Sequence, residues 1–216
     1  AKYVDAIYFK GDIGILVNLF TPSTLNWEET GLKLTMETDF PVTNNVKLII
    51  NESGSFNKDI CIRYPSWVEE GGIAITINGA KQKISAKPGE IIELSSSWAA
   101  GDEILITIPC KLRLVDLPDD INVSAIFYGP VLLAANMGEV GQSDIGFSWP
   151  QEEIKDPAPD AYFPSLMGSR KALESWIIKK EGTLNFTTTG LGKNYEMQPF
   201  YDTHHCRYNV YWKIGD

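Results

Sequence analysis

Residue types that commonly bind metals or carry out catalysis gather near the C-terminus, in the stretch Pro199–Trp212 (PFYDTHHCRYNVYW). Histidine, cysteine and aspartate are zinc ligands, and they also supply nucleophiles and general bases. If the stretch is a strand, alternate side chains share a face, so that Asp202, His204 and Cys206 would lie together. Ligands at alternate positions of one extended strand fit a tetrahedral ion poorly. We therefore expect a structural closing strand here, and no metal or catalytic site.

The polar side chains of this stretch have a structural use if they are paired. A buried histidine such as His204 can satisfy both ring nitrogens by hydrogen bonding to backbone or carboxylate groups. Arg207 can form a forked pair with an acidic partner such as Asp202. Tyr208 combines an apolar ring with a polar tip. We interpret His204, Arg207 and Tyr208 as structural residues.

The tryptophans raise the question of carbohydrate binding, because exposed aromatic rings can stack on sugars. Trp27 and Trp149 lie in polar segments and, with Tyr162, are the candidate carbohydrate-binding residues. Trp67 follows the end of a strand-like run and Trp98 precedes one, where an indole commonly closes the end of a sandwich. We expect Trp67 and Trp98 to be core residues. Burial of Trp27 and Trp149 is the alternative to sugar stacking, because large aromatic residues are mostly buried.

Other signatures of catalysis or cofactor binding are missing from the sequence. It contains no GxGxxG, no P-loop lysine motif and no GxSxG nucleophile elbow. Cys61, Cys110 and Cys206 are far apart and form neither a disulfide framework nor a zinc motif. We expect three buried thiols and no cofactor in this chain.

Charge and length limit the classes of partner. The chain has 216 residues and a formal charge of −9 at pH 7. Nucleic acids and anionic membrane surfaces are bound through basic faces, so we expect neither as a partner. No apolar run reaches the roughly 20 residues that a membrane-spanning helix needs. Because a strand-like run begins soon after Ala1, we interpret the chain as a piece of a longer protein.

Short strands separated by turn residues dominate the sequence. Leu32–Thr38 alternates apolar and polar residues with period two, as a half-buried strand does. Asn78-Gly79 is a strong signal for a tight hairpin turn. Further strand-like segments are Ala6–Phe9, Ile13–Phe20, Val46–Ile50, Ile60–Tyr64, Ile73–Ile77, Ile91–Leu94, Ile104–Ile108 and Val123–Tyr128. This spacing predicts an all-β protein with little helix.

A change of composition after residue 136 predicts the domain organisation. Residues 137–168 are rich in proline and glycine and have few periodic apolar positions, which is typical of a long irregular connection. Strand-like segments return after it. We therefore expect an antiparallel β-sandwich over residues 1–136. Residues 137–216 would form the irregular connection and a second, smaller β unit packed on the first.

A collinear series of short motifs resembles a known family. The motifs are Asn18-Leu19-Phe20, Pro22-Ser23, Leu25-Asn26-Trp27, Ile62–Trp67, Ile77-Asn78-Gly79, Trp98 with Gly101-Asp102, Tyr128–Val131, Pro199–Tyr201, His204-His205, Arg207-Tyr208 and Val210–Trp212. Together they resemble the region that follows the catalytic domain in bacterial β-L-arabinofuranosidase-type glycoside hydrolases of family GH127. The series spans nearly the whole chain, and its last motif is the most specific.

The resemblance implies a division of labour within such an enzyme. In that family an N-terminal α/α barrel carries catalysis, with a cysteine nucleophile held on zinc by cysteines and a glutamate, and with a carboxylate acid/base. Two β-sandwich regions follow the barrel. The catalytic cysteines lie in a Cys-Cys-Pro-Pro segment, and this chain contains no such segment. The resemblance therefore places zinc in the barrel and none in this chain, and it implies a periplasmic or extracellular location.

Two hypotheses for function follow. The first is a non-catalytic accessory region that supports an N-terminal catalytic barrel of the same polypeptide. The second is a carbohydrate-binding module that recognises plant-type oligo- or polysaccharide through exposed aromatic residues. Exposure of Trp27, Trp149 and Tyr162 on one flat surface would favour the binding module. Their burial, together with an exposed apolar patch, would favour the accessory region.

Overall fold

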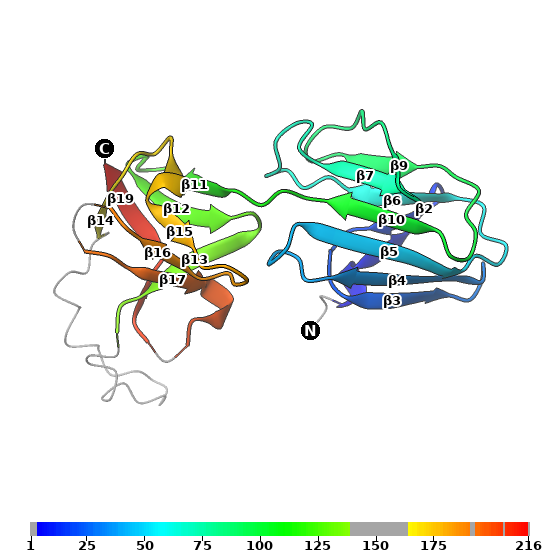
Figure 1. The fold of residues 1–216 in the computed structure, drawn as a ribbon, viewed down its shortest axis with the longest axis horizontal. Coiled ribbons are helices and arrows are strands. Elements are labelled where there is room, and N and C mark those ends of the chain that lie inside the picture. Colours follow the sequence, from blue (N-terminus) through cyan, green and yellow to red (C-terminus); the bar gives the residue numbers. More distant parts are fainter. Residues whose placement is uncertain (1–3, 139–163, 191–192, 205, 216) are drawn as a thin grey trace. The chain divides into compact units, whose positions relative to one another are not determined.

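A computed structural model describes residues 4–138, 164–190, 193–204 and 206–215 of the chain. The chain divides into two compact units, Ala1–Cys110 and Lys111–Asp216. The described helices are single 3-10 turns, η1 (Val4–Ala6), η2 (Leu173–Ser175) and η3 (Phe200–Asp202), and the other regular elements are strands (Figure 1). The predicted all-β fold is confirmed. No helix in the described ranges has the length and apolar character that a membrane crossing requires.

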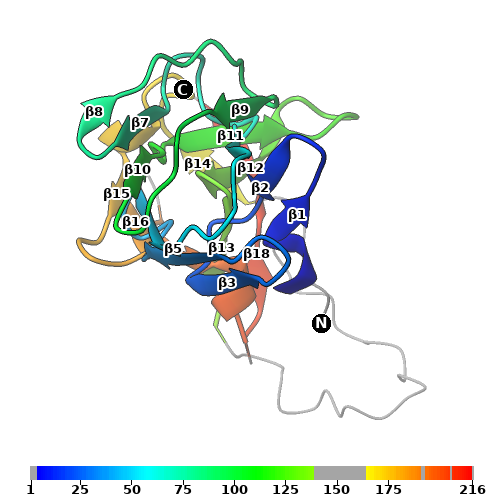
Figure 2. The ribbon, with the colours of Figure 1, turned by 90° about the vertical axis from the view of Figure 1, so that its right-hand side faces the viewer.

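The first unit is a sandwich of two sheets. Its strands are β1 (Tyr8–Lys10), β2 (Gly14–Val17), β3 (Ser23–Trp27), β4 (Leu32–Thr38), β5 (Asn45–Glu52), β6 (Asp59–Arg63), β7 (Ala74–Ile77), β8 (Ala80–Lys81), β9 (Ile91–Leu94) and β10 (Glu103–Thr107). One sheet has the order β1-β2-β6-β9, and the other has the order β3-β4-β5-β10-β7-β8. Figure 2 shows the β7–β8 hairpin, which forms one edge of the larger sheet. Strand pairs in this unit are antiparallel except β2 and β6, which are parallel.

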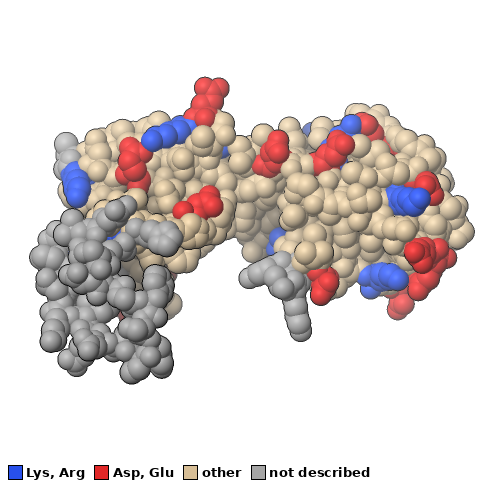
Figure 3. Space-filling model, turned by 90° about the horizontal axis from the view of Figure 1, so that it is seen from below, with Lys and Arg blue, Asp and Glu red and all other residues tan. Residues whose placement is uncertain are grey.

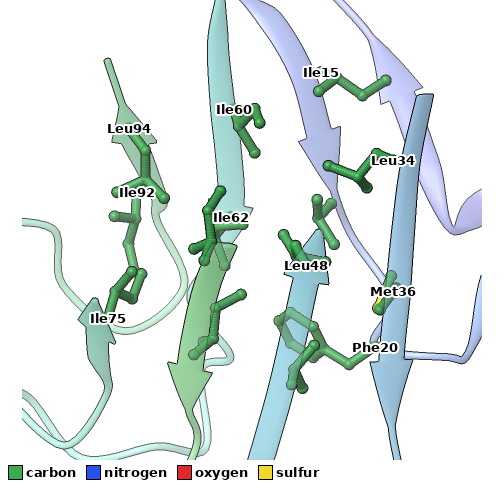
Figure 4. Close-up of a cluster of buried hydrophobic side chains, with 14 of the residues drawn as sticks. Ile15, Phe20, Leu34, Met36, Leu48, Ile60, Ile62, Ile75, Ile92 and Leu94 are labelled. Atoms are coloured by element: carbon green, nitrogen blue, oxygen red, sulfur yellow. The ribbon is translucent and has the colours of Figure 1, made fainter. Parts of the chain in front are cut away.

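The core of the first unit lies between these two sheets. In β4 the side chains of Leu32, Leu34 and Met36 are at most 1% exposed, and those between them are only half-buried. Figure 4 shows such residues of both sheets meeting, among them Leu34 and Leu48 of one sheet and Ile60, Ile62, Ile92 and Leu94 of the other. Full burial of one such aliphatic side chain stabilises the fold by about 1.5–3 kcal/mol relative to exposure.

Local backbone requirements are met at two places in this unit. Asn78 and Gly79 both have positive φ, 50° and 78°, as the predicted tight turn between β7 and β8 requires. Gly14 pairs with Asp59 where β2 runs parallel to β6. A Cβ atom at Gly14 would lie 1.9 Å from the Asp59 carbonyl oxygen, so only glycine allows this close approach.

The second unit is built on one extended, mostly antiparallel sheet. Its strands are β11 (Leu112–Asp116), β12 (Val123–Tyr128), β13 (Val131–Asn136), β14 (Ser165–Met167), β15 (Ile177–Lys179), β16 (Phe186–Thr188), β17 (Glu196–Pro199), β18 (Tyr208–Asn209) and β19 (Tyr211–Gly215). The order is β14-β19-β12-β13-β17-β16-β15, with β11 paired to β12 and β18 paired to β13. Phe186 and Trp212 are fully buried in this unit.

The boundary between the two units lies at a different residue from the one that the sequence predicts. The predicted boundary after residue 136 separates β12 and β13 from the later strands, whereas the compact units are Ala1–Cys110 and Lys111–Asp216. The physical reason is strand pairing: β12 pairs with β19 and β13 pairs with β17, so both belong to the second unit. That unit is accordingly almost as long as the first.

Trp98 lies in the core of the first unit, where its side chain is 6% exposed and its Nε1 donates to the Lys58 carbonyl oxygen at 3.1 Å. Trp67 is half-buried and stacks on Phe40 with ring centroids 6.3 Å apart. We expect Trp98→Ala to lower the free energy of unfolding by about 3–5 kcal/mol, as loss of a buried large aromatic does. The loss in Trp67→Ala should be smaller, because less surface is buried.

Chemical denaturation of the two variants, followed by circular dichroism, measures this difference. Equal stability of Trp98→Ala and the parent chain would show that the indole is not part of the core.

Candidate functional site

The stretch Pro199–Trp212 is not the single closing strand that the sequence predicts. β17 ends at Pro199, the 3-10 turn Phe200–Asp202 follows, and an irregular segment leads into the short strands β18 and β19. The alternation that would place Asp202, His204 and Cys206 on one face of a strand therefore does not apply. A helical turn breaks the extended backbone on which that prediction depended.

The polar residues of this stretch also differ from their predicted setting. His204 is exposed, so it does not take the buried, hydrogen-bonded place expected of it, and His205 lies outside the described residues. Arg207 is half-buried, and its backbone forms hydrogen bonds with Gly138 and Met137 at 2.9 and 2.8 Å. These backbone bonds fix the segment that precedes β18.

The described residues contain no group of three or more His, Cys, Asp or Glu side chains arranged to hold a metal ion. The three cysteines are buried and unbridged, Cys61 and Cys110 in the first unit and Cys206 in the second. Burial raises the pKa of the Cys61 thiol, and the nearby Glu93 and Asp59 carboxylates raise it further. A thiol with a raised pKa forms little thiolate, which is the nucleophilic and metal-binding form.

The candidate carbohydrate-binding residues do not form a surface in the described part of the chain. Trp27 is 6% exposed, donates from Nε1 to Glu29 Oε2 at 2.9 Å and packs against Phe56. Its indole therefore has little surface on which a sugar could stack. Trp149 and Tyr162 lie outside the described residues.

A polar cluster that the sequence did not reveal joins β11, β12 and the segment before η2. The Ser124 hydroxyl is fully buried and donates to Asp116 Oδ1 at 2.6 Å. The Arg170 guanidinium donates to the same Asp116 oxygen at 2.6 Å and to Ser124 Oγ at 3.1 Å. No local pattern links Arg170 to Asp116, because they are 54 residues apart. The cluster satisfies a buried hydroxyl, and we interpret it as structural.

The outer face of the four-stranded sheet carries apolar side chains. The strand register places Phe9, Leu16, Cys61 and Glu93 in one row across the sheet. Ile91, on the same face, pairs with Arg63. Phe9 is 47% exposed and Ile91 is 49% exposed. An outer sheet face is ordinarily polar, so apolar side chains here indicate a contact surface.

Aromatic side chains are exposed on the turn that follows β17 and on β18. Phe200 is 40% exposed, Tyr201 is 59% exposed and Tyr208 is 51% exposed. The rings of Phe200 and Tyr208 meet edge to face, with centroids 5.2 Å apart. We call these three residues the aromatic turn. The sequence does not reveal this exposure, because a single strand over this stretch would bury one of its faces.

Charged side chains form no comparable patch on the face of the molecule drawn in Figure 3. There, Asp and Glu side chains are scattered among Lys and Arg over the described surface. We take the apolar sheet face and the aromatic turn as the two candidate functional surfaces, because both expose large hydrophobic side chains.

Comparisons with known proteins identify the chain's relatives. Residues 14–110 match the sequence profile of the family described as Beta-L-arabinofuranosidase, GH127 middle domain. Residues 113–214 match the profile DUF4986, a domain of unknown function. Both profiles lie within the compact units defined above. None of the curated proteins compared with the chain matches it significantly.

Solved structures share the fold of the whole chain. A glycoside hydrolase matches with a TM-score of 0.66 and 20% identity, over 97% of this chain and 37% of its own. A GH127 beta-L-arabinofuranosidase from Geobacillus stearothermophilus T6 matches with a TM-score of 0.66 and 17% identity, over 98% of this chain and 35% of its own. A further GH127 beta-arabinofuranosidase matches with a TM-score of 0.65 and 18% identity, over 97% of this chain and 36% of its own. The chain thus spans about a third of the length of these structures.

The Asp116 cluster predicts how the second unit responds to acid. The hydrogen bond from Ser124, and then the bonds and charge of Arg170, hold the pKa of the Asp116 carboxyl below its ordinary value. Because the pKa is lower in the folded state, the ionised carboxylate makes its full contribution to stability at pH values above its pKa in the unfolded chain, about 4. This contribution is lost as the pH falls below that value, through the lower folded pKa.

We expect Asp116→Asn to be less stable than the parent chain at neutral pH, and this difference should shrink as the pH falls. Thermal melts between neutral and acid pH measure it. Asp119→Asn, which changes an exposed aspartate in the loop after β11, is the matched control. A constant difference between Asp116→Asn and the parent at every pH would contradict the proposed linkage.

Proposed function

We propose, from the match of residues 14–110 to the GH127 middle-domain profile, that this chain is a non-catalytic accessory region of a glycoside hydrolase. In this proposal it packs against an N-terminal catalytic barrel of the same polypeptide. The observation that carries the proposal is the apolar outer face of the four-stranded sheet. Its half-exposed apolar side chains, Phe9 and Ile91, are what a packing contact with another domain would cover.

The composition of this face supports a contact with another protein domain. Phe9 and Ile91 each leave about half of their surface to solvent, and Leu16 lies half-buried between β1 and β6. Covering such side chains gains about 25 cal/mol for each Å² of apolar surface removed from water. Arg63 and Glu93 flank them on β6 and β9. An apolar centre with charged neighbours is the usual anatomy of a protein–protein interface.

Arg63 is half-buried at this face, and part of its guanidinium is already hydrogen bonded within the chain. Its Nε donates to the Asn18 carbonyl oxygen at 2.7 Å, and burial lowers the pKa of its guanidinium. One donor is thus satisfied within the chain, while the guanidinium has further donors available for an acceptor on a partner. The motif Ile62–Trp67, which includes Arg63, is among those that resemble the glycoside hydrolase family.

The proposal assigns no metal to this chain. The zinc that the family resemblance implies would be held by residues of the barrel. Cys61 and Cys110 belong to the first unit and Cys206 to the second, and each is buried. The described residues contain no group of three or more ligand side chains of the kind that zinc requires.

A second candidate function, carbohydrate binding, is favoured by one observation. The aromatic turn exposes three rings on the surface of the second unit, although Trp27 of the original candidates is buried. The two functions do not compete, because they use different surfaces on different units. The accessory function is the primary proposal.

The purified chain should not hydrolyse aryl arabinofuranosides. The physical reason is that the described residues contain no metal-binding group of three or more His, Cys, Asp or Glu side chains, and that the raised pKa of the Cys61 thiol leaves little of the nucleophilic thiolate. Release of the aryl group, followed by absorbance, is the measurement. Turnover that persists through repeated purification would contradict the proposal.

Substitutions on the apolar sheet face test the contact with the barrel. We expect Phe9→Ser and Ile91→Ser to change the stability of the isolated chain by no more than about 0.5 kcal/mol, because both side chains are already exposed. In the polypeptide encoded by the whole gene, the same changes should lower the melting temperature and the glycosidase activity. Leu105→Ser, which changes a 39% exposed aliphatic residue of the other sheet, is the matched control.

Two outcomes would overturn the proposed contact. One is a gene that encodes no catalytic barrel upstream of Ala1. The other is a whole-gene product in which Phe9→Ser, Ile91→Ser and Leu105→Ser all behave alike.

A further inference from the structure

We propose that the aromatic turn, Phe200, Tyr201 and Tyr208, is a binding platform for a neutral oligosaccharide. The platform extends the proposed function, on which the choice of sugar class rests, and it uses a surface that the accessory function leaves free.

The exposure of the three rings is the first observation. Phe200 and Tyr201 lie on η3, and Tyr208 lies on β18, yet between 40% and 59% of each side chain is exposed. Large aromatic residues are mostly buried, because each can remove 150–250 Å² from water. A fold that leaves three such rings exposed in one short stretch gives up this stabilisation. Rings kept at the surface in this way are available to a ligand.

The support of the rings is rigid, so little order has to be created on binding. Gln198 Nε2 donates to the Asp202 carbonyl oxygen at 3.0 Å and to Thr203 Oγ1 at 3.3 Å. The Thr203 hydroxyl donates to the Pro199 carbonyl oxygen at 3.1 Å, and its backbone N–H donates to the Phe200 carbonyl oxygen at 3.1 Å. These bonds close the turn from both sides.

The third ring is fixed to the same sheet. Tyr208 pairs with Asn136 of β13, and β13 also pairs with β17, from which the turn emerges. The edge-to-face contact of Phe200 with Tyr208 then sets the two rings at 62° to each other. A ligand therefore meets preorganised rings, which reduces the entropy lost on binding.

The chemistry of the neighbouring groups indicates a sugar. The apolar C–H face of a sugar ring can stack on the electron-rich face of an aromatic ring. Asp202 of the same turn and His204, which follows the turn, are exposed and can accept or donate hydrogen bonds to hydroxyl groups. Tyr201 carries its phenol proton at neutral pH, as tyrosine ordinarily does, and burial and then the Asp202 carboxylate raise its pKa further. It can therefore donate to a hydroxyl oxygen.

Composition separates this surface from the apolar sheet face of the first unit. Every large hydrophobic side chain that is exposed between Pro199 and Trp212, in the described part, is aromatic. By contrast, the sheet face includes the exposed aliphatic residue Ile91. The net charge of −9 disfavours anionic polymers such as polyuronates. A neutral saccharide is the ligand that fits aromatic rings, hydroxyl-bonding groups and an acidic protein together.

Affinity gel electrophoresis of the chain with neutral arabinan in the gel tests the platform, with polygalacturonate as the anionic comparison. We expect arabinan to retard the parent chain and polygalacturonate to leave its mobility unchanged. Tyr208→Ala and Tyr201→Ala should each weaken arabinan binding at least tenfold. Ile178→Ala, which shortens a 45% exposed side chain elsewhere on the second unit, is the matched control and should bind as the parent does. Thermal melts verify that each variant is folded.

Three results would overturn the platform. They are no retardation of the parent chain by neutral polysaccharide, equal binding by all the folded variants, and self-association of the parent that Tyr208→Ala abolishes. The last would show that the aromatic turn contacts a second copy of the chain. Failure of the accessory function is distinguishable, because it appears only when the sheet-face variants are tested in the whole-gene product.

Discussion

The sandwich of the first unit depends on burying one face of every central strand between two sheets. Leu32, Leu34 and Met36 of β4 contribute to this layer, and Ile60 and Ile62 of β6 meet it from the other side. Register must be kept throughout, because a slip of one residue would turn an entire apolar face toward water. The parallel approach of β2 to β6 is part of the same constraint, since it is possible only with glycine at position 14.

Because the inner faces of the two sheets form the core, the side chains on the outer faces can make other contacts. On the four-stranded sheet the outer row contains Phe9 and Leu16, and Ile91 lies on the same face. About half of the Phe9 and Ile91 side chains is left exposed outside the core of this unit. This exposure is the physical basis for proposing that the face contacts a partner domain.

The second unit combines a well-packed sheet with a surface turn whose aromatic side chains are exposed. β12 is buried on both faces over Val123–Ile126, and the polar Ser124 within it is tolerated because Asp116 and Arg170 satisfy its hydroxyl. The turn after β17 is different, because its backbone is held by Gln198 and Thr203 while its rings face solvent. Rigid backbone and exposed rings together are what a binding surface needs, and neither is required for packing.

Local sequence patterns predicted the strands, the turns and the family resemblance. Period-two alternation is a local property, so Leu32–Thr38 could be recognised as a strand with its bounds correct, and Asn78-Gly79 as a turn with positive φ. The motif series likewise indicated the GH127 resemblance that the profile of residues 14–110 confirms. Only the tertiary structure decided which distant strands pair. The pairing of β13 with β17 moved the unit boundary to Cys110.

Exposure, too, was decided by tertiary structure. His204 is exposed, the reverse of what its local sequence favoured, and Trp27 is buried although it lies in a polar segment, because burial depends on what packs against a side chain from elsewhere in the chain. The same holds for the row of Phe9 and Leu16, which exists only through the register of strands, and for the ring of Tyr208 beside Phe200. Local pattern sets the conformation of a segment, but its surroundings set which of its side chains a partner can reach.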